Sequence, residues 1–123
     1  MTRTKRLGPV VDHTDRKEQD ALKAVAVCQT ALELDDNKLS QLKVYKIEYQ
    51  QRQTQAGQIC SALNLQEFSR FLAQLDNTIK QQQAVVEMRR KELEYKRRTW
   101  QSARINSKVI HKVVENLHQQ TQT

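Results

Sequence analysis

Histidine and cysteine are the side chains of this sequence best suited to chemistry, and they are few. His111 and His118 lie seven residues apart, which places them on one face of a helix, and His13 could approach them if the two ends of the chain meet. Cys28 and Cys60 fit no metal-binding or redox spacing, which favours free thiols in a reducing cytosol. No carboxylate or cysteine cluster accompanies the histidines. The sequence therefore predicts no metal site and no cofactor.

Other catalytic signatures are missing too. The sequence has no glycine-rich phosphate loop, no nucleophile elbow and no glycosidase-like carboxylate pair, so we do not expect an enzyme. Its 21 Lys and Arg residues against 14 Asp and Glu give a net charge of +7, which favours acidic partners such as nucleic acid or an acidic protein surface. No apolar run approaches the ~20 residues that span a bilayer. The first residues are basic but lack the apolar core of a secretory signal.

Glycine and proline are scarce, which leaves the backbone few places to turn. Among 123 residues there are two glycines and one proline, and residues 1–11 hold the proline and one glycine. We expect this segment to form a basic, loosely ordered arm. Asp12, Thr14 and Asp15 can each cap a first helix that runs over about 12–57.

A single turn signal interrupts the rest of the chain. Gly57 is suited to a helix C-terminus, and Asn64 with Glu67 forms a capping box for a second helix over about 65–119. The organisation predicted is a basic arm at 1–11, a single hairpin at 12–119 with its turn at 58–64, and a tail at 120–123.

Apolar residues recur in both helices with the alternating three- and four-residue spacing of a coiled coil. In the first helix the two rows are Val11, Glu18, Val25, Leu32, Leu39, Lys46, Gln53 and Ala21, Cys28, Asp35, Leu42, Tyr49, Ala56. In the second helix they are Leu72, Ile79, Val86, Leu93, Trp100, Ser107, Val114 and Phe68, Leu75, Gln82, Arg89, Lys96, Ala103, Ile110, Leu117. The fold class predicted is all-α, an antiparallel two-helix coiled-coil hairpin.

The two seams fix their own alignment, because facing residues of an antiparallel hairpin have a constant number sum. Pairing Leu39 with Val86 gives 125, and half of that sum falls inside the turn at 58–64. In the other row the constant sum is 124, which places Asp35 opposite Arg89. We hypothesise that these opposite charges form a register pair that discriminates against slipped alignments at little net gain in stability.

Two surface clusters are candidate binding sites. Tyr45, Tyr49, Phe71 and Leu75 gather on or beside the seam, and exposed aromatic rings are typical binding anchors, although they could simply widen the seam. The second cluster, called the basic end below, forms where the termini meet and consists of Arg3, Lys5, Arg6, Arg16, Lys17, Arg104, Lys108 and Lys112.

Three stretches resemble the FliJ family, small coiled-coil proteins of the bacterial flagellar export apparatus. Residues 45–49 (YKIEY) resemble the Y-x-x-E-Y stretch late in that family's first helix. Residues 71–82 (FLAQLDNTIKQQ) resemble its F-[LI]-x-x-L-x-x-x-I-x-Q segment, and residues 98–103 (RTWQSA) resemble its tryptophan region. The resemblance runs from about residue 12 to 117, and it lies in order, spacing, size and turn position together.

The resemblance implies a non-enzymatic stalk and adaptor of the flagellar type III export system, located at the cytoplasmic face of the inner membrane. Its implied partners are the hexameric export ATPase, which it would stimulate, the cytoplasmic linker of the export gate protein, and export chaperones. The positions that match the gate-binding patch, called the aromatic patch below, are Leu42, Tyr45, Tyr49, Phe71 and Leu75. Lys38, Thr78 and Gln82 hold neighbouring positions. The basic end suits the surface that faces the ATPase.

Two other readings stay open. The equivalent stalk of a virulence injectisome has a related shape, and the Y-x-x-E-Y stretch favours the flagellar member. A basic coiled-coil nucleic-acid binder would use the same cations, but the sequence lacks the interleaved aromatic residues of a single-strand binder, with Trp100 placed in the seam.

Overall fold

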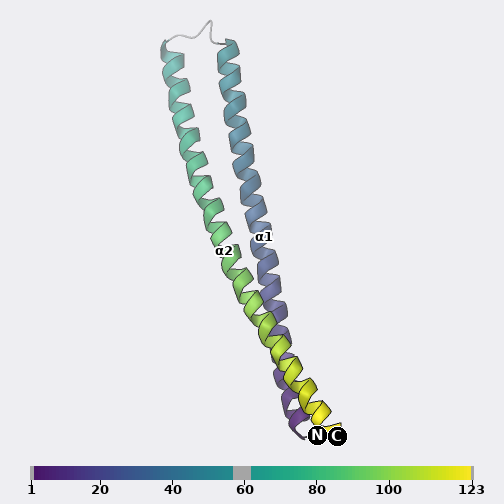
Figure 1. Ribbon diagram of the computed structural model, residues 1–123. Coiled ribbons are helices and arrows are strands. Elements are labelled where there is room, and N and C mark those ends of the chain that lie inside the picture. Colours follow the sequence, from purple (N-terminus) through teal and green to yellow (C-terminus); the bar gives the residue numbers. More distant parts are fainter. Residues whose placement is uncertain (1, 57–61, 123) are drawn as a thin grey trace. The chain divides into compact units, whose positions relative to one another are not determined.

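The chain forms two helices that pack against each other. The computed structural model describes residues 2–56 and 62–122, and all of these residues are helical. Helix α1 spans Thr2–Ala56 and helix α2 spans Ala62–Gln122. The two helices run in opposite directions, as the colours of Figure 1 show. The predicted all-α helical hairpin is thereby confirmed.

The paired helices divide into two compact units. Unit 1 joins Met1–Gln29 to Lys91–Thr123, and unit 2 comprises Thr30–Arg90. The buried residues of unit 1 are Val25, Cys28, Leu93, Ala103 and the polar Ser107. The core of unit 2 is formed by Leu39, Leu75, Ile79 and Val86, with Leu32, Leu42 and Phe71 packed against it.

Burial follows the predicted seam. Every seam residue whose burial the structure describes is buried or half-buried, whereas most of the residues between seam positions are exposed. Val86 is the most completely covered of the buried side chains, at 2% exposure. A two-stranded coiled coil covers only this narrow stripe of each helix, because the facing positions alone insert between the residues of the partner.

The predicted alignment holds in unit 2. Leu39 and Val86, which should face each other, share one core cluster. Lys46, a seam position, directs its ammonium group to the carboxylate of Asp76 at 2.5 Å. A lysine is tolerated on the seam because its aliphatic stem can cover apolar surface while its charged end reaches a partner outside.

The start of α1 differs from the prediction. The expected loose arm at 1–11 is helical from Thr2, and Pro9 lies inside the helix. Extending an existing helix costs far less than nucleating one, and proline already has a helical φ angle, so the loss of one backbone hydrogen bond does not end the helix here. Thr14 is therefore not a cap, and its hydroxyl donates to the carbonyl oxygens of Val10 and Val11.

Helix α2 starts before residue 65, where the sequence predicts its start. Helix α2 begins at Ala62, so Asn64 lies inside the first helical turn and not at the cap position. Residues 62 and 63 are alanine and leucine, both strong helix formers, which explains the extension. Helix α2 also runs on to Gln122, past the predicted end at residue 119. The predicted C-terminal cap at Gly57 and the thiol of Cys60 lie outside the described residues.

The seam predicts that substitutions at nearby positions of α2 change the free energy of unfolding by very different amounts. Val86→Ala should lower the free energy of unfolding by about 2 kcal/mol, because it removes buried methyl groups and leaves a cavity. Met88→Ala, at a side chain that is 55% exposed, should change it by less than about 0.5 kcal/mol. Urea unfolding followed by circular dichroism measures both variants. Equal losses would contradict the seam assignment.

Candidate interaction surfaces

The predicted register pair is present in unit 2. Arg89 Nε donates to Asp35 Oδ2 at 2.9 Å. The side-chain amide of Gln82, also a seam position, donates to the backbone carbonyl of Asp35 at 2.8 Å. Seam position 35 is therefore tied to two positions on the opposite helix, one heptad apart. Its role in selecting the alignment stays a prediction.

The pKa of Asp35 reflects this environment. The hydrogen bond from Arg89, followed by that from Gln82, holds the pKa of the carboxyl below its ordinary value of 3.8. A folded-state pKa that lies below the unfolded-state value stabilises the fold at pH values above the latter. That contribution is lost as the pH falls through the folded-state pKa.

The aromatic patch forms a stacked cluster in unit 2. The ring centroids of Tyr49 and Phe71 are 4.6 Å apart, and those of Tyr45 and Phe71 are 6.3 Å apart with the rings edge to face. Phe68, which was assigned only to the seam, also stacks on Tyr49 at 5.1 Å. Edge-to-face and offset pairs at these separations are favourable beyond their burial. The rings therefore support one another as a single rigid surface.

Exposure differs within the patch. Tyr45 is 43% exposed, while Leu75 is buried in the core and cannot serve as a surface anchor. Tyr45 and Leu42 line a surface hollow together with Lys38, Gln41 and Gln82. The hollow places an apolar wall beside amide and ammonium groups. A site of this composition can bind an apolar side chain of a partner and orient it through polar contacts.

The basic end belongs to unit 1. The side chains of Lys5, Arg6, Arg16, Lys17, Arg104, Lys108 and Lys112 are exposed, and the side chain of Arg3 lies outside the description. Unit 1 holds 13 of the 21 basic residues and 7 of the 14 acidic ones, and so carries +6 of the net charge. The guanidinium carbon of Arg104 lies 5.6 Å from the centroid of the Trp100 ring, a cation–π contact.

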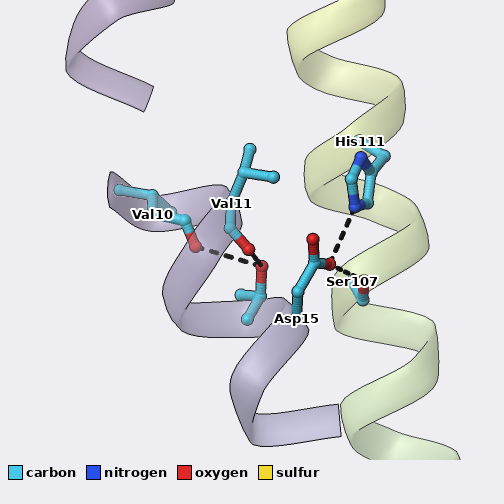
Figure 2. A network of polar contacts seen from close by, with 6 residues as sticks. Val10, Val11, Asp15, Ser107 and His111 are labelled. Atoms are coloured by element: carbon cyan, nitrogen blue, oxygen red, sulfur yellow. Dashed lines mark hydrogen bonds and ion pairs between the residues drawn. The ribbon is translucent and has the colours of Figure 1, made fainter. Parts of the chain in front are cut away.

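A polar network in unit 1 was not predicted from the sequence (Figure 2). Asp15 Oδ1 accepts hydrogen bonds from Ser107 Oγ at 2.9 Å and from His111 Nε2 at 2.8 Å. The sequence predicts Asp15 as a helix cap. Its number sums with those of Ser107 and His111 to 122 and 126, on either side of the constant sum of 124 in that row. The alignment could therefore have found the network. The bond from His111, then that from Ser107, lowers the pKa of the Asp15 carboxyl.

This network offers no catalytic arrangement. The hydroxyl of Ser107 donates to Asp15, and Ser107 is only 4% exposed, so a substrate has no access to it as a nucleophile. Among residues 2–56 and 62–122, no group of three or more His, Cys, Asp or Glu side chains is placed to hold a metal ion. Cys28 is a buried free thiol.

Neither helix, over its described residues, contains an apolar stretch long enough to cross a membrane.

The Asp35 contacts predict how a substitution of this residue changes the stability and the alignment of the helices. Asp35→Leu should leave the stability at pH 7 nearly unchanged, because an apolar residue replaces a paired charge. The variant should lose less stability than the unmodified chain between pH 7 and pH 3, and should populate more than one alignment or oligomeric state. Urea unfolding at both pH values and light scattering after size exclusion measure these outcomes. A single, equally stable monomer would contradict the alignment role, and unchanged acid sensitivity would contradict the pKa assignment.

Comparison with known proteins identifies the family. Neither a search of curated proteins nor a search of solved structures gave a match. The family model described as "Flagellar FliJ protein" matches residues 4–123. Because that match covers nearly the whole length, the chain belongs to the FliJ family.

Proposed function

We propose that this chain is a non-enzymatic stalk and adaptor that binds the hexameric export ATPase and couples it to the export gate protein. Membership of the FliJ family makes it a component of the flagellar export apparatus. The proposal adds that it stimulates ATP hydrolysis by its partner, assists export chaperones, and works at the cytoplasmic face of the inner membrane.

The observation that carries the proposal is the aromatic patch of unit 2. Tyr45 is exposed, is held in place by Tyr49 and Phe71, and borders a hollow that has both apolar and polar walls. A rigid aromatic ring at the rim of a pocket loses little conformational entropy on binding, which is why such residues dominate interface energies. We assign the patch to the export gate protein, with Leu75 supporting it from the core.

The basic end of unit 1 is the second surface of the proposal. A +6 charge concentrated in one unit attracts an acidic surface and accelerates encounter with it. We assign it to the export ATPase. The two surfaces lie in different units, which supports the proposal of an adaptor with two partners.

Removal of the exposed ring should weaken gate binding. We expect Tyr45→Ala to raise the Kd for the cytoplasmic region of the export gate protein by about tenfold or more, since an anchor residue is lost. Ile47→Ala is the matched control, because Ile47 is 54% exposed on the same helix but outside the hollow, and it should have an effect of less than about twofold. Biolayer interferometry measures both. Undiminished binding by Tyr45→Ala and by Tyr49→Ala would remove the gate assignment.

Neutralisation of the basic end should weaken ATPase stimulation. Lys5→Gln/Arg6→Gln/Arg16→Gln should raise the concentration that gives half-maximal stimulation several-fold at low salt and less at high salt, because exposed charges are screened. The control Lys43→Gln/Arg52→Gln/Lys80→Gln removes the same charge from exposed positions of unit 2. Phosphate release by the purified export ATPase is the readout. If both triple variants stimulate like the unmodified chain, the basic end does not contact the ATPase.

A further inference from the structure

Unit 1 carries a second surface feature, a hollow between α1 and α2. Its wall on α1 is formed by Lys17, Asp20 and Ala21, and its wall on α2 by Thr99, Ser102, Ala103 and Asn106. Ala21 and Ala103 are seam positions with short side chains, which leave the groove between the helices unfilled. The hollow also shows which positions of the two helices share one side of unit 1.

Of the positions one heptad away from the hollow, five carry large exposed apolar side chains, while His13 and Glu92 are polar. Residues seven apart lie on the same face of a coiled-coil helix. Val27 follows Asp20 by seven residues and Tyr95 precedes Ser102 by seven, and these side chains are 69% and 66% exposed. The same spacing takes Lys17 to Val10, Asn106 to Val113 and Ser102 to Val109. The apolar side of unit 1 is defined here as Val10, Val27, Tyr95, Val109 and Val113.

This side is distinct from the rest of unit 1. Among the described residues of the unit, seven large apolar side chains are exposed, and five of them lie on the apolar side; the other two are Leu22 and Ile105. A run of exposed apolar groups on both flanks of a groove marks an interaction surface more often than singly scattered residues do.

Positive charge borders the apolar side. Residues four apart on a helix are neighbours, and four residues before Val27 and Tyr95 stand Lys23 and Lys91. Arg98 holds the same position relative to Ser102 in the hollow, but its guanidinium is paired with the carboxylate of Glu94. These three cations are exposed. A second copy of unit 1 would bring +6 against +6, so the charge opposes self-association through this face and favours an acidic occupant.

We propose that the apolar side of unit 1 binds an acidic amphipathic helix of another protein. The helix would lie along the groove between α1 and α2, place an apolar side chain in the hollow above Ala21 and Ala103, and direct its carboxylates to Lys23 and Lys91. A helix fits better than a lipid surface, because a ridge of side chains can enter the hollow and a flat bilayer cannot. The inference does not depend on the assignments to the ATPase and the gate.

The test uses the full chain and a synthetic helical peptide of about three heptads, with leucines on one face and glutamates on its flanks. Fluorescence anisotropy should show saturable binding that weakens with salt. Val27→Ser/Tyr95→Ser should raise the Kd at least about tenfold. The matched control Leu22→Ser/Ile105→Ser removes two equally large exposed apolar residues of unit 1 from other faces, and should change the Kd less than about twofold. Circular dichroism confirms that both variants are folded.

Two further binding measurements test the chemistry of the partner that occupies this face. The same peptide with lysine in place of glutamate should bind at least about tenfold more weakly, since like charges meet. Vesicles of phosphatidylglycerol and phosphatidylcholine should bind the unmodified chain and the Val27→Ser/Tyr95→Ser variant equally. Equal binding of both peptides, equal weakening by the control variant, or no peptide binding would overturn the proposal. Vesicle binding that is lost only in Val27→Ser/Tyr95→Ser, without peptide binding, would assign the face to a lipid surface.

Discussion

Two helices without a third layer can bury only the stripe along which they touch, and this constraint governs the molecule. The seam residues between α1 and α2 are buried or half-buried, and the remaining positions are mostly exposed. A helix of 55 or 61 residues whose composition is this polar gains its stability chiefly from packing against its partner. The seam must therefore supply both the stability and the alignment, while most of each helix surface stays available for other proteins.

We expect polar residues on or beside the seam to exchange some of that stability for a unique alignment. In unit 2, Asp35 is held by Arg89 and Gln82, and in unit 1, Asp15 is held by Ser107 and His111. An apolar seam tolerates a shift by one heptad, because one aliphatic side chain replaces another. A hydrogen-bonded carboxylate does not tolerate it, since a shift leaves a partly buried charge without its donors. Each unit thus contains a carboxylate that is hydrogen-bonded across the two helices.

The narrow seam also explains why binding surfaces form directly beside it. Tyr45, Tyr49 and Phe71 are too large to be covered by a two-helix contact, so they stack on one another and Tyr45 stays partly exposed to solvent. In unit 1 the opposite occurs, because Ala21 and Ala103 are too small to fill the contact and a hollow remains. Side chains that are too large for the contact between the helices and side chains that are too small for it both create surface features that a partner can recognise. The two units also differ in charge, because unit 1 carries +6 of the net charge of +7.

The sequence by itself determined the fold class, the seam and the alignment, because scarce glycine, heptad spacing and a constant number sum all express one periodic contact. It also predicted the contact between Asp35 and Arg89. The helix start differs from the prediction, because Gly8 and Pro9 are local helix breakers and only the structure shows that the helix continues through them. The burial of Leu75, the stacking of Phe68 and the hollow at Ala21 were decided by the tertiary structure, because each depends on the size of side chains on the opposite helix. Likewise, Asp15 could serve as a cap or as a cross-helix acceptor, and only the proximity of Ser107 and His111 selects the second role.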